Sequence, residues 1–422
     1  MKELNFPHKY MRNFTLAKQI VQTLVKAGFT TYFAGGWVRD YLMNHPSDDI
    51  DIATKAPVDV IQRLFPKTIP VGLAFGIVIV VVEGHQFEVA TFRKEKGYVD
   101  GRRPTHIESA TPEEDALRRD FTINGLFWDP LTETLYDYVE GQKDLTSGII
   151  RAIGDPHARF LEDRLRMIRA VRYSTRFNFS IEIETYQAIL THAKSLFPSV
   201  AIERIWQEFH KMAQFGKLDT SFLELYKLGL LTTIFPELQG LNIQELEKKI
   251  EPFKRFPKKT PVIAYVLELF PDRSLEELLS ICEYLKLSRI EKNFTLFFYR
   301  AKKMLFMPKD WKIELVEWAH FYADSQSYIC LQIFGNGLPS KDRNEFFDFH
   351  QQKQHLLKKA IERIQEKQPL VTSSSLKAAG ITPGKQMGLL LQEAERLSIN
   401  QQMEDPQEII SQLKKMPLWS HS

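Results

Sequence analysis

The stretch that decides the fold reads Gly35-Gly-Trp-Val-Arg-Asp-Tyr-Leu-Met-Asn-His-Pro-Ser-Asp-Asp-Ile-Asp-Ile-Ala-Thr54. Its first half is a Gly-Gly turn running into a helical pattern, which offers backbone N–H groups and a positive helix end to a phosphate. Its second half contains Asp49 and Asp51, and alternate residues of a strand project from one face. These two carboxylates can hold one or two hard cations together. A pair of metal ions beside a phosphate-binding turn is the minimum that nucleotidyl transfer requires.

The residues around this stretch predict a strand, a turn, a short helix and a second strand. Residues 30–34 are β-branched and aromatic, residues 37–43 fit a short helix, and residues 49–53 alternate charged with apolar side chains. Asp-x-Asp occurs in many solvated loops, and Gly-Gly is usually only a turn. Because both halves lie on one strand–turn–helix–strand path, the combination favours the functional interpretation.

The composition is that of an ordinary soluble globular protein with room for several domains. The 422 residues are 44% hydrophobic and 26% charged, and the net charge of +3 permits a nucleic-acid partner without demanding one. The two cysteines, Cys282 and Cys330, form no disulfide framework or metal cluster. The N-terminus lacks an apolar signal core, and the longest apolar run, 71–82, is too short to span a bilayer. We therefore expect a cytoplasmic protein with no membrane partner.

The chain changes character near residue 150. Before it, apolar β-rich runs alternate with helical patterns, beginning with a capped helix at 13–27 and including strands at 76–82 and 86–92 that read as a hairpin. After about residue 155 almost everything has helical periodicity, with Pro and Gly as punctuation. The sequence thus predicts a mixed α/β head followed by a long helical body.

Glu88 is the natural third carboxylate of the predicted site. It lies on the polar face of the strand 86–92, antiparallel to or near the Asp strand, where it could complete a metal site or accept the proton of an attacking hydroxyl. An ordinary solvent-facing glutamate is the alternative. The polar, glycine-containing stretch 94–103 that follows is expected to be a mobile surface loop, and its position makes an active-site lid conceivable.

A second group of polar residues follows an acidic helix start at 111–115. Arg118 and Arg119 supply forked donors that suit triphosphate oxygens, while Asp120 and Asn124 could bind a ribose or lock the arginines. A solvated charge run at a helix end is the alternative origin of such a cluster. The apolar residues interleaved at 121 and 123 favour a segment pinned to the core.

A third group recurs every third residue along 160–172, a stretch that we expect to form one helix. Its members are adjacent on a helix surface and comprise Asp163, Arg166, Arg169 and Arg172. An Asp beside an Arg presents a hydrogen-bond acceptor next to a donor. This pair matches the amino donor and ring-nitrogen acceptor on the Watson–Crick edges of cytosine and adenine, and it does not match the carbonyl and ring N–H of uracil and guanine. Salt bridges between residues three apart on an exposed helix are the alternative.

These motifs occur together, and in this order, in one known family. Taken as a set, the chain resembles class II tRNA nucleotidyltransferases and bacterial poly(A) polymerases, which belong to the polymerase-beta-like nucleotidyltransferase superfamily. The resemblance covers roughly the first half of the chain and rests on Gly-Gly-Trp-Val-Arg-Asp, Asp-Ile-Asp, Arg-Arg-Asp-Phe-Thr-Ile-Asn, Glu162-Asp-Arg-Leu-Arg166 and Glu203-Arg-Ile-Trp-Gln-Glu208. Farther on, residues 228–238 look like the helical RNA-binding segment of the same proteins, and 380–388 like the tail of CCA-adding members.

The resemblance implies a fold class: an α+β head with the polymerase-beta-like nucleotidyltransferase fold, followed by an all-α neck, body and tail in a seahorse-like arrangement. The implied domains are a catalytic head at 1–150, a neck with the nucleotide-template helix at 151–220, an RNA-binding body at 221–335 and a tRNA-binding tail at 336–422. Family members usually have Gly where this chain has Asn44, and Ala where it has Gly125. Both replacements are small, so we expect the fold to tolerate them.

The resemblance also implies roles for individual residues. Asp49 and Asp51 would be the ligands of two magnesium ions, with Glu88 as a further catalytic carboxylate. Asp163 and Arg166 would act as a protein template for the incoming base, and residues 203–208 would stiffen the neck behind them. The nucleotide-binding set would comprise Gly35, Gly36, Arg39, Arg118, Arg119, Asp120, Asn124, Asp163, Arg166, Arg169 and Arg172.

The activity implied is template-independent addition of CCA to the 3′ end of tRNA from CTP and ATP, with release of pyrophosphate. The expected partners are therefore the acceptor arm of tRNA, ATP and CTP; the oligomeric state is not readable. A poly(A) polymerase, or an enzyme adding only A or only CC, uses the same head motifs and is the alternative. A catalytically silent RNA-binding protein is the alternative from another class, and the intact acids at 49, 51 and 88 argue against it.

Overall fold

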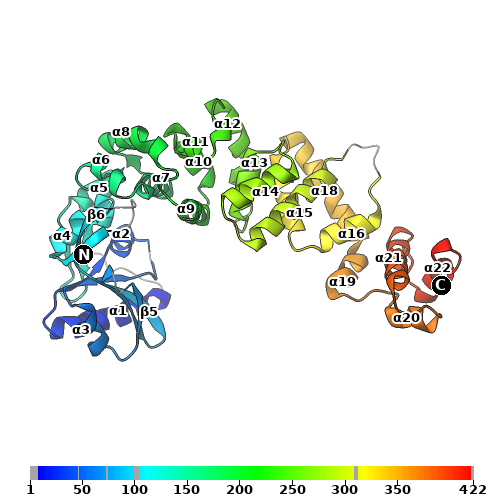
Figure 1. The fold of residues 1–422 in the computed structure, drawn as a ribbon, viewed down its shortest axis with the longest axis horizontal. Helices are drawn as coiled ribbons and strands as arrows, with labels where there is room; N and C mark the ends of the chain where they lie inside the picture. The colour runs from blue at the N-terminus through cyan, green and yellow to red at the C-terminus, as the bar shows by residue number, and fades with distance from the viewer. Residues whose placement is uncertain (1–7, 46, 73–74, 99–103, 308–311, 420–422) are drawn as a thin grey trace. The chain divides into compact units, whose positions relative to one another are not determined.

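The computed structural model of the chain describes residues 8–45, 47–72, 75–98, 104–307 and 312–419. These residues divide into two compact units, with the division between Glu245 and Leu246. A mixed α/β head occupies the start of the first unit, and the rest of the chain is helical (Figure 1). The finer division into head, neck, body and tail stays a prediction.

The head is built on a seven-stranded mixed sheet with the strand order β3-β4-β5-β2-β1-β8-β9. Its β2 and β5 run parallel, with Ile52 opposite Val89, whereas its other neighbouring strands pair antiparallel. The parallel register brings the start of β2 beside Glu88. The strands are β1 (Thr31–Ala34), β2 (Asp51–Thr54), β3 (Thr68–Gly72), β4 (Ile77–Val82), β5 (His85–Thr91), β8 (Leu126–Asp129) and β9 (Thr134–Asp137).

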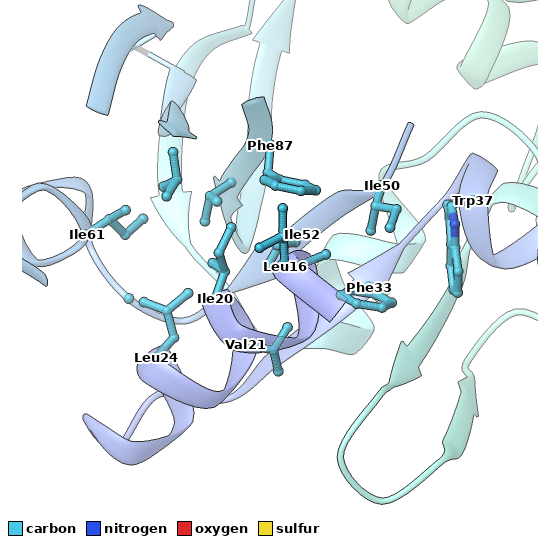
Figure 2. Close-up of a cluster of buried hydrophobic side chains, with 14 of the residues drawn as sticks. Leu16, Ile20, Val21, Leu24, Phe33, Trp37, Ile50, Ile52, Ile61 and Phe87 are labelled. Atoms are coloured by element: carbon cyan, nitrogen blue, oxygen red, sulfur yellow. The ribbon is translucent and has the colours of Figure 1, made fainter. Parts of the chain in front are cut away.

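Helices α1 (His8–Lys26) and α3 (Val58–Leu64) pack against the strands and close the main core of the head. Figure 2 shows this core, in which Leu16, Ile20 and Leu24 of α1 meet side chains of the sheet. Ile50 and Ile52 are only 3% and 1% exposed. Burial of the isoleucines on either side of Asp51 holds the opposite face, which carries the acidic side chains, toward solvent.

The predicted hairpin of two strands and the predicted short helix of the head are confirmed in outline. The hairpin of β4 and β5 pairs Ile77 with Ala90 and Val82 with His85, and its β-branched run explains why. Helix α2 (Gly36–Leu42) follows β1 directly. It is followed by Asn44 at φ 57°, a left-handed conformation that Asn adopts more readily than most residues do. The replacement of the family's usual Gly is tolerated here for that reason.

Two predictions about the head were wrong. The Asp strand begins at Asp51 instead of 49, so Asp49 lies just before β2. Residues 94–98 of the predicted surface loop belong to β6 (Arg93–Tyr98), which pairs antiparallel with β7 (Pro104–Ser109); the predicted loop's residues 99–103 lie outside the described residues. In both cases, the hydrogen bonds to a neighbouring strand determine which residues are in the strand. The sequence of one segment does not reveal which other segment it will pair with.

The predicted helix over 160–172 was also wrong, because it is two helices. Helix α6 (Pro156–Glu162) ends at Asp163, and α7 (Leu165–Phe177) begins two residues later. Asp163 has extended backbone angles, φ −147° and ψ 104°, and its Oδ1 accepts the backbone N–H of Leu165 at 3.0 Å. Asp163 therefore lies just before the N-terminus of α7, the helix that carries the arginines, and not within it.

Helix α4 (Pro112–Leu117) precedes β8, and a reciprocal capping box between Thr111 and Glu114 begins it. The remaining helices of the first unit follow β9. A short parallel pair, β10 (Ile149–Ile150) and β11 (Ser180–Ile181), accompanies them. These remaining helices are α5 (Gly141–Ser147), α8 (Ile183–His192), α9 (Ile202–Gln214), α10 (Leu218–Lys227), α11 (Leu230–Ile234) and α12 (Ile243–Ile250). Helix α12 crosses the division between the units.

In the described residues of the second unit, helices are the only regular elements. Residues 371–413 build a separate hydrophobic core with contributions from α20 to α22. In the part of the chain that the structure describes, no helix combines the length and hydrophobicity of a membrane span. The helices are α13 (Val262–Leu269), α14 (Leu275–Tyr284), α15 (Arg289–Leu305), α16 (Leu315–Ala323), α17 (Ser327–Gly337), α18 (Ser340–Leu356), α19 (Lys358–Glu366), α20 (Ser373–Ala378), α21 (Lys385–Asn400) and α22 (Pro406–Leu413).

Candidate active site

One cavity of about 940 Å³ in the first unit collects every residue that the sequence analysis singled out for the site. Strands β1, β2 and β5 line one part of it, and α7 and α9 another. The predicted residues that line it are Gly35, Gly36, Arg39, Asp49, Asp51, Glu88, Arg118, Arg119, Asp120, Asn124, Asp163, Arg166, Arg169 and Arg172.

Three carboxylates gather where β2 and β5 lie side by side. Burial, followed by the charges of Glu88 and Asp49, raises the pKa of Asp51 to about 7, and Arg119 offsets only part of this. Partial desolvation and the charge of Asp49 also raise the pKa of Glu88, against the opposing effect of Arg93. The negative charge here is therefore incompletely compensated by the protein itself, as expected of a site that takes up a cation.

The donor set at this point fits a magnesium ion that has further ligands from outside the protein. Across the described residues, no three His, Cys, Asp or Glu side chains are arranged to hold a metal ion by themselves. The role of Glu88 as a third carboxylate of the site therefore stays a prediction. Magnesium commonly takes one or two carboxylates and fills its remaining positions with water and substrate phosphates.

Gly35 serves the cavity in a different way from the one predicted. Its backbone N–H already donates to the carbonyl oxygen of Leu126 at 3.0 Å, so it is not available to a phosphate as the Gly-Gly turn suggested. Gly35 has φ +69°, and a Cβ added to it would lie 2.7 Å from Nη1 of Arg119. The positive φ favours glycine, and the absence of a Cβ lets the Arg119 guanidinium lie directly against the turn.

Arg118 and Arg119 share one buried carboxylate, that of Asp115. Oδ1 of Asp115 accepts from Nε of Arg118 at 2.9 Å, and Oδ2 accepts from Nη2 of Arg119 at 3.0 Å. Burial alone would raise the pKa of Asp115, but Arg119 and Arg118 hold it below its ordinary value. The two arginine side chains are each 18% exposed, whereas Asp115 is 1% exposed.

The side chains of Asp120 and Asn124 bind arginines other than Arg118 and Arg119, the pair that they were predicted to lock. Oδ2 of Asp120 accepts from Nε of Arg169 at 2.7 Å, and its Oδ1 accepts from Nδ2 of Asn124 at 3.0 Å. Oδ1 of Asn124 accepts in turn from Nη1 of Arg39. Burial opposes the ionised form of Asp120, yet the charge of Arg169 keeps the pKa of Asp120 far below its usual range.

The two residues of the predicted base-reading pair do not bind each other. Asp163 accepts from Nη2 of Arg204 at 2.7 Å. Arg166 donates from Nη1 to Glu162 at 2.8 Å and from Nη2 to the carbonyl oxygen of Arg118 at 3.2 Å. Both nevertheless line the same cavity, and each is held by a partner outside the predicted pair.

Arg172 extends the arginine row but is nearly buried. Its Nε donates to Glu208 of α9 at 2.6 Å, and its guanidinium lies 4.1 Å from the centre of the Tyr173 ring. Burial opposes the ionised form of Glu208, while Arg172, Arg169 and Lys211 together hold its pKa below the ordinary value. Glu208 belongs to the predicted neck segment 203–208, and it supports α7 directly.

The cavity also contains residues that the sequence analysis missed. Arg176 donates to Asp40 at 3.1 Å and lies over the ring of Phe215, with its guanidinium 4.2 Å from the ring centre. Continuing the arginine row of α7 by one turn would have found Arg176. Asp40 and Arg204 lie within motifs that the sequence analysis quoted, but no role in the site was predicted for either. Lys211 and Phe215 carry no such signal, because tertiary packing brings them to the cavity.

The comparisons with known proteins agree with this picture. Residues 31–151 match the model of the poly A polymerase head domain, and residues 178–241 match that of the probable RNA and SrmB-binding site of polymerase A. The CCA-adding enzyme of Bacillus subtilis is 41% identical over 228 residues, and that of Pediococcus pentosaceus is 39% identical over 269 residues. The aligned stretches cover 54% and 62% of this chain.

The structural match extends over nearly the whole chain. The crystal structure of the Bacillus stearothermophilus CCA-adding enzyme in complex with CTP superposes with a TM-score of 0.77, at 26% identity, over 96% of this chain and 97% of that one. A Thermotoga maritima CCA-adding enzyme complexed with tRNA shares the fold at 20% identity, with a TM-score of 0.66 and coverage of 97% and 95%.

The mixed sheet and the helices that follow it define a nucleotidyltransferase head with a helical body. The chain belongs to the family of tRNA nucleotidyltransferases and bacterial poly(A) polymerases. In sequence, the chain aligns with 56% of the length of the Bacillus subtilis relative and 66% of that from Pediococcus pentosaceus.

Proposed function

We propose that this protein adds CCA to the 3′ end of tRNA, using CTP and ATP and releasing pyrophosphate. The observation that carries the proposal is that one cavity brings together the acids, the arginines and the predicted template residues Asp163 and Arg166. The similarity to relatives named CCA-adding enzymes, at about 40% identity, supports this choice within the family.

The chemistry assigns each part of the cavity a role. Asp49 and Asp51 would hold magnesium together with water and substrate phosphates. When bound, the metal would lower the pKa of the attacking 3′-hydroxyl and offset the charge of the leaving pyrophosphate. Arg118 and Arg119 grip the triphosphate, and Asp163 with Arg166 reads the base of the incoming nucleotide. The hydroxyl attacks the α-phosphate, and positioning with electrostatic stabilisation supplies most of the rate.

The test uses tRNA transcripts that end just before the first C, before the second C or before the final A. Each transcript is incubated with one nucleotide at a time, and products are resolved at single-nucleotide length. We expect C on the first two, A on the third, and a single sharp final band whose length does not change with time. Failure to add any nucleotide to any of the transcripts would exclude the proposed activity.

A poly(A) polymerase is the second candidate, because both matching family models carry the name of that enzyme. The same assay separates the two when an unstructured RNA is supplied with ATP. Long adenylate ladders on that RNA would favour the second candidate, whereas a product that stops after one A on tRNA supports the first. An enzyme that adds only A or only CC would act on a subset of the transcripts.

A further inference from the structure

Asp115 contacts two arginines of the cavity and the strand beside them. It lies on α4, and its carboxylate accepts from the guanidinium groups of two successive residues, Arg118 and Arg119. Oδ1 also accepts the backbone N–H of Arg93 at 3.2 Å, at the start of β6. One carboxylate therefore fixes two cationic side chains and the strand next to them.

Both arginines face the cavity, and Asp115 lies behind them. Arg118 and Arg119 line the cavity, while Asp115 is not among its lining residues. Arg119 is held on its other side by the carbonyl oxygen of Asn124, which accepts from Nη1 at 3.3 Å. The backbone carbonyl of Arg118 accepts from Arg166. Asp115 thus holds both guanidinium groups from behind, and the carbonyl oxygen of Asn124 holds that of Arg119 in addition.

We infer that Asp115 is a positioning residue that sets both arginines of the triphosphate grip. This inference rests on the proposed function and deepens it. A long arginine side chain loses rotamer freedom when it binds a phosphate, and a buried carboxylate that fixes it beforehand removes that loss from the binding step. Asp115 would therefore act on the triphosphate, which CTP and ATP share, and not on the base.

The central experiment is Asp115→Asn, which keeps the shape and removes the charge that orients both guanidinium groups. We expect the KM for CTP and for ATP to rise by about tenfold or more, the factor that corresponds to one charge-assisted hydrogen bond. The ratio of kcat/KM for CTP over UTP should stay unchanged. Inorganic tripolyphosphate, used as a competitor, should show a Ki raised by the same factor as the KM.

Glu114→Gln is the matched control. Glu114 is the neighbouring acid, and among the described residues its side chain bonds to the helix cap at Thr111 and to Lys94. We expect wild-type KM and Ki from this variant. A double-mutant cycle then tests the route of action: once Arg119→Ala is present, adding Asp115→Asn should cost less than it costs in the wild type.

Several outcomes decide the inference separately from the proposed function. Wild-type protein that adds no nucleotide to tRNA contradicts the function. An active wild type with an Asp115→Asn variant of unchanged KM and Ki overturns the positioning role, and so does a fully additive cycle. If Asp115→Asn does not fold, Asp115→Glu replaces it, because it keeps the charge and shifts the carboxylate by one methylene; an unchanged Ki for tripolyphosphate in that variant overturns the inference.

Discussion

Asp51 stands at the first position of β2, between the carboxylates of Asp49 and Glu88. A pKa near 7 means that the site binds either a proton or a cation close to neutral pH. In an enzyme that works on triphosphates, a bound cation neutralises the carboxylates and the substrate at the same time. The strand register that places Val89 opposite Ile52 is what brings these acids together.

The acids at 49 and 51 give the first prediction at the residue scale. Asp49→Ala and Asp51→Ala should each lower the rate of nucleotide addition by at least about a hundredfold, because several kcal/mol of charge stabilisation are lost. Binding of tRNA, measured by gel shift, should stay within about twofold. Asp59→Ala is the control, because Asp59 is an exposed acid of the same unit that pairs with Arg63. Near-normal turnover in either variant would remove these residues from the metal site.

Base choice gives the second prediction at this scale. Arg166→Ala should lower the preference for CTP over UTP by at least about tenfold, because a wrong base no longer leaves a buried donor unpaired. Initial rates with all four nucleotides measure this. Arg159→Ala is the matched control, since Arg159 also binds Glu162 but does not line the cavity. An equal loss of rate with every nucleotide would make Arg166 a phosphate or structural residue.

At the scale of elements, α7 is the helix on which the cavity depends. Ion pairs attach it to α9 through Arg172 and Glu208, and to α2 through Arg176 and Asp40. Arg172 and Glu208 have side chains 7% and 2% exposed. Breaking such a buried pair costs far more than breaking an exposed one, because the remaining charge stays without compensation.

Glu208→Gln should therefore lower the free energy of unfolding by about 3 kcal/mol at neutral pH. The folded pKa of Glu208 is below its unfolded value, so its contribution is present above pH 4.5 and is lost as the pH falls through the folded pKa. Urea unfolding at pH 7 measures the loss, and Glu224→Gln, which breaks the more exposed pair with Lys227 on α10, is the control. Equal stability of the Glu208 variant and wild type would contradict the role assigned to this pair.

The sequence predicted which elements exist better than it predicted how they meet. The β4–β5 hairpin and α2 follow from local signals: a β-branched run and a Gly-Gly turn. The pairing of Asp163 with Arg204 does not, because the two residues are 41 positions apart. The sequence motifs contained both the arginines of the cavity and acids that hold them, such as Asp40 and Glu208. Which acid pairs with which arginine was not visible, since folding alone brings those segments together.

At the scale of the whole molecule, the two compact units allow separate unfolding transitions. His350 of α18 belongs to the second unit and is 4% exposed, with Nδ1 2.7 Å from the hydroxyl oxygen of Tyr322 on α16. Burial, with a smaller effect of Lys353, lowers the pKa of His350 to about 4. Such a histidine is neutral in the folded protein at a pH where the unfolded chain already takes up a proton.

The second unit should therefore lose stability on acidification between pH 6.5 and 4, because the unfolded state binds more protons in that window. From pH 7.5 to 5.5, the contribution of His350 should fall by about 1 kcal/mol. Calorimetric scans of wild type and His350→Gln should show a weaker pH dependence for the variant in the transition of the second unit. His355→Gln, an exposed histidine of the same helix, is the control; an identical pH dependence in all three proteins would contradict the assignment.

The pairing of the arginines with carboxylates has a consequence for the kind of attraction that the cavity can exert. Asp115, Glu162, Asp120 and Glu208 each offset part of the positive charge of an arginine while holding its guanidinium group in place. An anion bound under the proposed function would therefore meet oriented N–H donors and little excess positive charge. Its affinity should then depend more on hydrogen-bond geometry than on long-range attraction, and so less on the salt concentration than that of an anion on an exposed basic surface.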